Sequence, residues 1–246
     1  MNLETFEGGE HPIMREIRDV IIARDQGRPR SRQSLVGPSE VGQECARRLA
    51  YRMMREPKPP QPAYDPWAAI TGTAVHTWLA EAFAEANERL GRVRYLIEKT
   101  VEIRPGLSGS CDLYDADRAI VIDHKNVGTT MAKKYREDGP SEQYRVQAHL
   151  YGRGFRNLGL PVKEVAIVFF PKAGNLGGTF IWSEPYSDEV VDQALARHDT
   201  ILEASIALDV TESPENYERL PKSVSRLCRY CPWFQPGGSG RTCPGE

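Results

Sequence analysis

The chain has 246 residues, of which 40% are hydrophobic and 27% charged, and its formal net charge is -2 at pH 7. This composition is typical of a globular protein, and it excludes a disordered chain or a histone-like basic protein. No run approaches 18 apolar residues, and the acidic first ten residues lack the apolar stretch of a signal peptide. We therefore expect neither a membrane span nor export.

The N-terminal part carries helical patterns and a proline-rich loop. Apolar spacing predicts a helix over 11–26, and Ser39 predicts the N-cap of a second helix that carries Cys45. Residues 57–66 are dense in proline and predict a loop.

The middle of the chain alternates between helix and strand patterns. Capping residues and apolar periodicity predict helices over 65–90, 141–158 and 187–208. Strands are predicted over 95–103, 110–114, 119–124, 165–170 and 179–182, with a tight turn at 115–117. The order helix, three strands, helix, strand indicates an α/β core, in which a strand meander is followed by a helical crossover.

This pattern divides the chain into three parts. We expect an N-terminal helical region over 1–64, the α/β core over 65–210, and a segment rich in Cys, Pro and Gly over 211–246. The last segment has few apolar residues, so we expect bound ligands to hold it together.

Charges are unevenly spread. Residues 131–163 carry seven Lys or Arg against three Asp or Glu, whereas residues 181–216 carry one Arg against nine acids. By charge alone, Arg145, Arg153 and Arg156 in the basic segment are candidate phosphate contacts.

Two of the predicted strands each carry an aspartate. Adjacent strands lie about 4.8 Å apart, so Asp112 and Asp123 can share one divalent cation. Alternation places Asp123 and Lys125 on one sheet face and His124 on the other. Oxygen ligands select Mg²⁺ or Mn²⁺, and such an ion beside a lysine suits phosphodiester hydrolysis. For the Asp-x-Lys motif alone, an ordinary surface pair on an edge strand is the alternative.

Three more residues are candidates for the same site. His76 lies in the long helix just before the three strands, where the alternative is a satisfied core histidine. Gln147 and Tyr151 are spaced i, i+4 and share one face of the helix predicted over 141–158. An ordinary half-buried helix face is the alternative for this pair.

Four of the five cysteines suggest a second metal site. Cys228 and Cys231 have the Cys-x2-Cys spacing of metal ligands, Cys243 follows, and Cys45 lies far upstream. Both an iron–sulfur cluster and a structural zinc remain open, and thiolate chemistry alone favours zinc. We expect the fifth cysteine, Cys111, to pack into the sheet as a small apolar residue.

These motifs occur in the order found in the RecB-type nucleases of the PD-(D/E)xK superfamily, which the sequence resembles from Ser39 to Cys243. The matching motifs are Gly72-x3-His76, Gly109-x2-Asp112, Asp123-x-Lys125 and Gln147-x3-Tyr151. With Cys45 and the C-terminal triad, the chain resembles the iron–sulfur subgroup, which includes the CRISPR-associated exonucleases of the Cas-four type. The spacer from Cys231 to Cys243 is longer than is usual in that family.

The resemblance implies a PD-(D/E)xK core with a C-terminal iron–sulfur clasp, and a metal-dependent DNA exonuclease activity. Its implied metal ligands for Mg²⁺ or Mn²⁺ are His76, Asp112, Asp123 and the carbonyl of His124, and its implied catalytic residues are Asp112, Asp123 and Lys125. The implied ligands of a 4Fe–4S cluster, with zinc as the alternative, are Cys45, Cys228, Cys231 and Cys243. The residues implied to support the site or contact DNA are Gln147, Tyr151 and Arg145.

The same resemblance implies partners and a location. DNA with a free or single-stranded end is the expected substrate, in recombination, repair or CRISPR spacer acquisition. The expected protein partners are a second copy of the chain or proteins of those processes. The expected location is the cytoplasm of a bacterial, archaeal or phage-infected cell. Two alternatives remain: a DNA-binding subunit that does not cut, and a zinc-stabilised structural protein.

Overall fold

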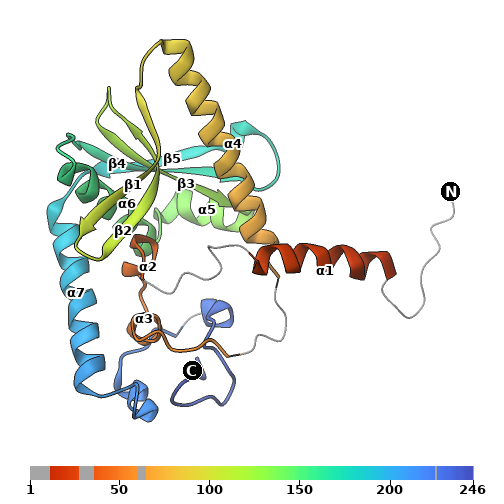
Figure 1. Cartoon of the computed structure of the whole chain (residues 1–246), viewed down its shortest axis with the longest axis vertical. Coiled ribbons are helices and arrows are strands. Elements are labelled where there is room, and N and C mark those ends of the chain that lie inside the picture. The colour runs from red at the N-terminus through yellow and green to blue at the C-terminus, as the bar shows by residue number, and fades with distance from the viewer. Residues whose placement is uncertain (1–11, 28–35, 60–64, 225, 246) are drawn as a thin grey trace.

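A five-stranded sheet forms the centre of the protein, whose computed structural model describes residues 12–27, 36–59, 65–224 and 226–245 (Figure 1). The strands are β1 (Tyr95–Arg104), β2 (Leu107–Asp115), β3 (Ile120–Val127), β4 (Glu164–Pro171) and β5 (Phe180–Pro185), in the spatial order β1-β2-β3-β4-β5. The first three strands form an antiparallel meander, β4 runs parallel to β3, and β5 is antiparallel to β4. The predicted meander and helical crossover are confirmed.

Seven α-helices lie in the described part of the chain. They are α1 (Pro12–Gln26), α2 (Pro38–Val41), α3 (Ala46–Met53), α4 (Trp67–Leu90), α5 (Thr129–Asp138), α6 (Glu142–Asn157) and α7 (Asp188–Ala207). Short 3-10 turns occur at Leu176–Gly178, Pro214–Arg219 and Arg226–Tyr230. Within the described ranges, no helix combines the length and apolar character that a membrane crossing requires.

The prediction of one helix running from Ser39 through Cys45 is wrong. Helix α2 is a single turn that follows Gly37, and α3 begins separately with Cys45 as its N-cap. The chain bends at Gly42, where an added Cβ would come within 2.8 Å of the Cα of Gln143. This close approach between the bend and α6 interrupts the helix and leaves Cys45 at the start of α3.

Helix α5 was not predicted. It begins after Gly128 with Thr129 and Thr130, two β-branched residues of low helix propensity. Its buried Tyr135 packs against Phe169 of β4 with ring centroids 5.1 Å apart. Packing on the sheet therefore stabilises a helix that local propensity does not indicate.

Helix α6 lies unusually close to the sheet. The Ser141 side chain caps it by accepting a hydrogen bond from the amide of Tyr144. An added Cβ on Gly154 would come within 2.5 Å of the Val101 side chain of β1, so only glycine fits there. This close packing brings the polar face of α6 within reach of β3.

Helix α4 lies on the opposite face of the sheet from α6. The ring of His124 stacks on Phe83 of α4, whereas the neighbouring Asp123 is hydrogen-bonded by Gln147 of α6. Since consecutive strand residues face opposite sides, the two helices cover opposite faces. The helix ends at Gly91 in a left-handed conformation with φ 64°.

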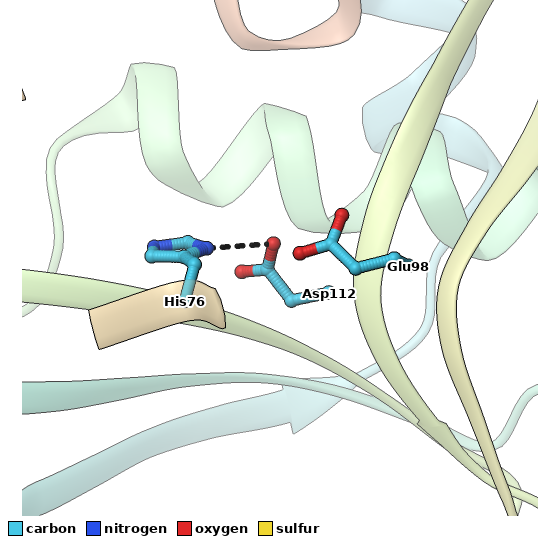
Figure 2. Close-up of side chains that lie close together, drawn as sticks. All are labelled: His76, Glu98 and Asp112. Carbon is cyan, nitrogen blue, oxygen red and sulfur yellow. Dashed lines mark hydrogen bonds and ion pairs between the residues drawn. The ribbon is translucent and has the colours of Figure 1, made fainter. Parts of the chain in front are cut away.

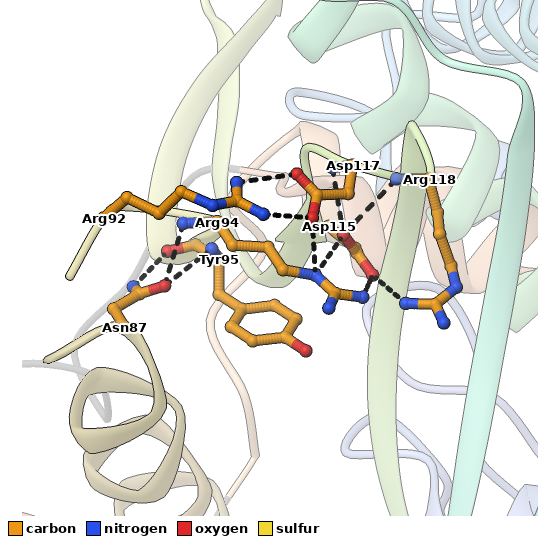
Figure 3. A network of polar contacts seen from close by, with 7 residues as sticks. All are labelled: Asn87, Arg92, Arg94, Tyr95, Asp115, Asp117 and Arg118. Atoms are coloured by element: carbon orange, nitrogen blue, oxygen red, sulfur yellow. Dashed lines mark hydrogen bonds and ion pairs between the residues drawn. The ribbon is translucent and has the colours of Figure 1, made fainter. Parts of the chain in front are cut away.

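A polar network fixes the end of α4 to the β2–β3 hairpin (Figure 3). Buried Asp115 accepts hydrogen bonds from Arg94 and Arg118 and caps the turn by accepting one from the amide of Asp117. Asn87 of α4 holds the following segment by accepting hydrogen bonds from the amides of residues 94 and 95. These contacts set the position of α4 relative to the strands that carry the acidic motifs.

Two apolar clusters make up the core. The larger one lies between the sheet, α6 and α7, and Phe155, Ile167 and Val191 are fully buried within it. The smaller one joins α3 to the C-terminal segment, where Tyr51 stacks on Trp233 with ring centroids 5.4 Å apart. Helix α3 and the C-terminal segment thus pack on each other beside the sheet (Figure 1).

Candidate active site

The acidic motifs meet where β2 and β3 separate. Backbone pairing between these strands ends at Leu113 and Ile122. One residue further along each strand lie Asp112 and Asp123. The amide of His124 donates a 2.6 Å hydrogen bond to Asp112 Oδ2 in place of a backbone partner. The two predicted aspartates therefore lie at one split in the sheet, as a shared ion requires.

Helix α4 and strand β1 supply two more side chains here (Figure 2). His76 Nδ1 lies 3.1 Å from Asp112 Oδ1. Glu98 of β1 lies beside Asp112, and one ligand atom from each of His76, Glu98 and Asp112 falls within 4.8 Å of the other two. These three residues form a group with the donor types and spacing of a cation site.

On the α6 side, Lys125 and Gln147 hold Asp123. Lys125 Nζ lies 2.6 Å from Asp123 Oδ2, and Gln147 donates a 3.0 Å hydrogen bond to Asp123 Oδ1. The same amide accepts a 3.1 Å hydrogen bond from Lys125 and donates one of 3.4 Å to the Tyr151 hydroxyl. The ring of Tyr144 lies 4.7 Å from the Lys125 ammonium. Asp123, Lys125, Gln147 and Tyr151 thus form one connected network.

One carboxylate oxygen of Asp123 is incompletely satisfied. Its side chain is buried, and Oδ2 makes no hydrogen bond of acceptable geometry despite its short distance to Lys125. A buried acceptor without a hydrogen bond is costly. The donor set, including this oxygen that pairs with Lys125 without a well-directed hydrogen bond, fits a hard divalent ion such as Mg²⁺ or Mn²⁺.

Burial and neighbouring charges shift the acid–base properties of the site. Burial raises the pKa of Asp123 to about 6, against the lowering effect of Lys125. Burial is the strongest influence on Asp112 and tends to raise its pKa, but the hydrogen bonds and positive charge from His76 and His124 together outweigh it, so the pKa is lowered. For Lys125, burial tends to lower the pKa, but the charge and hydrogen bonding of Asp123 together with the charge of Asp112 outweigh it, so the pKa is raised. Lys125 therefore stays an ammonium at neutral pH.

His124 contributes its backbone more than its ring. The ring packs among Phe83, Phe170 and His76, and burial lowers its pKa to about 4. It is therefore neutral and points away from Asp123. The prediction that its carbonyl binds metal remains a prediction.

The predicted phosphate contacts on α6 are engaged in ion pairs. Arg145 Nε lies 2.6 Å from Glu184 of β5. Arg153 pairs with Asp188 and Asp192 of α7, and Arg156 also pairs with Asp188. The basic and acidic segments of the sequence thus neutralise each other in the fold, and a phosphate would have to compete with these carboxylates.

Four cysteines line one cavity of about 300 Å³ between α3, the C-terminal segment and the start of α6: Cys45, Cys228, Cys231 and Cys243. No three of their sulfur atoms, all within the described ranges, lie within 4.8 Å of one another. Cys111 is fully buried in the sheet, as predicted. Tyr144 lines the cavity and also contacts Lys125, so the cavity adjoins the acidic site.

Glu98 is the residue of this site that the sequence did not indicate. The alternating residues from Tyr95 to Ile103 predict the strand, but Glu98 lies between them and belongs to no recognisable motif. The signal was available in the hairpin register, because Ile97 pairs with Leu113 and Lys99 with Cys111, which places Glu98 opposite Asp112.

Comparison with known proteins adds evidence on the fold. No known protein family and no curated protein matches the sequence. The solved alkaline exonuclease LHK-Exo from Laribacter hongkongensis matches with a TM-score of 0.51 at 16% identity, over 74% of this chain and 95% of that one. LHK-Exo in complex with dAMP gives the same values.

A phage-related exonuclease from Haemophilus somnus matches with a TM-score of 0.42 at 13% identity, over 64% of this chain and 78% of that one. The mixed α/β fold with its five-stranded sheet is thus similar to that of the alkaline exonuclease from Laribacter hongkongensis.

Proposed function

We propose that this chain is a DNA exonuclease that depends on Mg²⁺ or Mn²⁺ and belongs to the RecB-type PD-(D/E)xK nucleases. The observation that carries the proposal is the convergence of Asp112, Asp123 and Lys125 at the split between β2 and β3, where Asp123 Oδ2 is buried without a hydrogen bond. The fold, similar to that of an alkaline exonuclease, supports the same activity.

The residues at the split have separate roles in this proposal. Asp112, Asp123, His76 and the His124 carbonyl would supply the ligands for divalent metal at the split. The ion would supply Lewis-acid polarisation of the scissile phosphate and a lower pKa for an attacking water. Lys125, charged and held by Asp123 and Gln147, would donate hydrogen bonds to the water or to a phosphate oxygen. Its raised pKa makes it a donor and not a general base.

The cysteine cavity is the proposed site of a 4Fe–4S cluster, with a structural zinc as the alternative. All four candidate ligands, Cys45 and the C-terminal triad, line this one cavity, and Cys111 does not. Four thiolates around one zinc, at about 2.3 Å each, would lie roughly 3.8 Å apart. No three of the four sulfur atoms lie within 4.8 Å of one another, so the structure does not itself form a tetrahedral zinc site.

The proposed substrate is DNA with a free or single-stranded end. The proposed processes are recombination, repair or CRISPR spacer acquisition, in a cell or in phage infection. We retain the three-part division at residues 64/65 and 210/211 as a proposal, with the C-terminal part as the clasp. Arg145, Arg153 and Arg156 are weaker candidates for DNA contact, since each is already paired with carboxylates.

The direct test is a cleavage assay on DNA labelled at either end. The full chain, purified without oxygen, should release mononucleotides or short fragments from single-stranded or duplex ends with Mg²⁺ or Mn²⁺, and none with a chelator. Binding of the same DNA without cleavage under every metal condition would contradict the proposal and favour a non-cutting DNA-binding subunit.

Gln147 should matter for turnover. Gln147→Leu removes the hydrogen bonds to both Asp123 and Lys125, so the ammonium loses its fixed direction. We expect the cleavage rate to fall about 10- to 100-fold, equivalent to about 1.4 to 2.7 kcal/mol, with little change in the concentration of DNA needed for half-maximal rate. Gln193→Leu, on the exposed face of α7, is the matched control and should leave the rate unchanged.

Arg47 should matter for stability. This nearly buried side chain of α3 donates hydrogen bonds to the carbonyls of Glu218 and Leu220 and lies 3.9 Å from Cys243 Sγ. Arg47→Met leaves those carbonyls without donors, and we expect a loss of about 2 to 4 kcal/mol in the free energy of unfolding by urea. Arg48→Met, on the same helix and half-buried, should change it by less than about 0.5 kcal/mol. Equal effects of the two substitutions would show that the Arg47 contacts do not hold the C-terminal segment.

A further inference from the structure

Glu98 is held in an unusual position for a strand residue. It lies on β1 opposite Asp112 and has φ 46°, in the left-handed region that residues other than glycine rarely adopt. Its Oε2 accepts a 3.0 Å hydrogen bond from Ser110 of β2. The conformation and this bond direct the carboxylate to the mouth of the split, next to Asp112 (Figure 2).

Glu98 brings uncompensated negative charge. Within the described part of the chain, no lysine or arginine lies within ion-pair distance of it, and the ammonium of the site, Lys125, is paired with Asp123. Glu98, Asp112 and Asp123 thus place three carboxylates on three neighbouring strands against one ammonium and the His76 ring. Like charges so close together disfavour one another, and a bound cation would offset that repulsion.

The spacing of the ligand atoms fits one ion. Ligands of Mg²⁺ lie about 2.0 to 2.1 Å from it, so opposite ligands are about 4.2 Å apart and adjacent ones about 3 Å. His76 Nδ1 and Asp112 Oδ1 are 3.1 Å apart, and Glu98 completes a group within 4.8 Å. An imidazole nitrogen among the ligands favours Mn²⁺ over Mg²⁺.

Asp123 does not belong to this group. Its carboxylate lies on the third strand, is 1% exposed, and has an oxygen without a hydrogen bond. Asp123 is not part of the group that His76, Glu98 and Asp112 form within 4.8 Å of one another. Asp123 is buried, whereas Glu98 is exposed to solvent. A single ion therefore cannot be coordinated by both Glu98 and Asp123 in this arrangement. Asp112, on the strand between theirs, is the carboxylate that can reach both positions.

We propose that His76, Glu98 and Asp112 form an outer Mn²⁺ position, distinct from a buried position at Asp123, with Asp112 contributing to both. The inference rests on the proposed metal-dependent function and adds to it a second cation and a ligand, Glu98, that lies outside the motifs of the resemblance. The outer position faces solvent, where an incoming phosphate would reach it first.

Mn²⁺ binding to the full chain, followed by the electron paramagnetic resonance signal of free Mn²⁺, tests this inference without DNA. We expect two ions per wild-type chain. Glu98→Gln should bind one, with the affinity of the lost position reduced at least about tenfold. Asp123→Asn should lose the buried ion and keep the outer one.

Two further variants make the result specific. Glu98→Asn removes the carboxylate, and asparagine tolerates the left-handed conformation, so it should reproduce Glu98→Gln. Glu102→Gln replaces another exposed glutamate of the same strand and should bind two ions. Unchanged Mn²⁺ binding in both Glu98 variants would overturn the inference. It would also be overturned if the wild-type chain bound a single Mn²⁺ whose affinity fell equally in Glu98→Gln and Asp123→Asn.

This result is separable from the proposed function. If the chain binds two Mn²⁺ in the expected manner but degrades no DNA, the nuclease proposal fails and the outer position stands. If the chain degrades DNA and the Glu98 variants bind Mn²⁺ as the wild type does, the nuclease proposal stands and the outer position fails.

Discussion

Asp112→Asn and Asp123→Asn should each reduce DNA cleavage at least about a thousandfold, equivalent to about 4 kcal/mol of transition-state stabilisation. Each substitution keeps the shape of the side chain and removes a charged ligand at the split between β2 and β3. Lys125→Met should have an effect of similar size, because it removes the only ammonium within 4.0 Å of the Asp123 carboxylate in the described structure. Rates on end-labelled DNA at saturating Mn²⁺ provide the measurement.

Asp117→Asn is the matched control for these substitutions. Asp117 lies in the turn of the same β2–β3 hairpin and pairs with Arg92, away from the split (Figure 3). It should retain near-full activity. Melting temperatures of all variants separate a lost site from a lost fold, because a folded and inactive Asp123→Asn chain is the expected outcome. Near-wild-type cleavage by that variant would show that the reaction takes place elsewhere.

The order of elements was predictable because it depends on local patterns. Alternating residues predict β1, and the continuous apolar run 165–170 predicts β4. The i, i+4 spacing predicts that Gln147 and Tyr151 share one face of α6, where their side chains are hydrogen-bonded to each other. These features are set by periodicity within one element, so they can be read without knowing what packs against it.

The features that could not be predicted depend on contacts between distant segments. Helix α5 exists because Tyr135 packs on β4, and Arg145 is neutralised by Glu184, which lies 39 residues later. Glu98 depends on the register of β1 against β2 and on a left-handed backbone that no local pattern marks. The bend at Gly42 likewise follows from its close approach to α6.

The proposal that four cysteines in one cavity bind an iron–sulfur cluster can be tested by substituting each of them. Cys45→Ser, Cys228→Ser, Cys231→Ser and Cys243→Ser should each abolish the iron content and brown colour expected of the anaerobically purified chain. Cys45 lies at the start of α3 and Cys243 near the end of the chain, so a shared cluster closes a loop of nearly 200 residues. Loss of a cross-link over so long a loop should also lower the free energy of unfolding by several kcal/mol.

Cys111→Ala is the control that distinguishes ligation from burial. Cys111 is fully enclosed in the sheet, and its sulfur lies 3.6 Å from the carbonyl of Leu113, so it has no access to the cavity. The substitution should cost about 1 kcal/mol or more through the small void it leaves, yet keep the full iron content. Iron lost from Cys111→Ala, or kept in Cys243→Ser, would contradict the assignment of ligands. If protein produced with ample iron and without oxygen contained stoichiometric zinc and no iron, the cavity would be assigned as a zinc site and not as an iron–sulfur site. The nuclease site would remain unaffected, because it uses none of these cysteines.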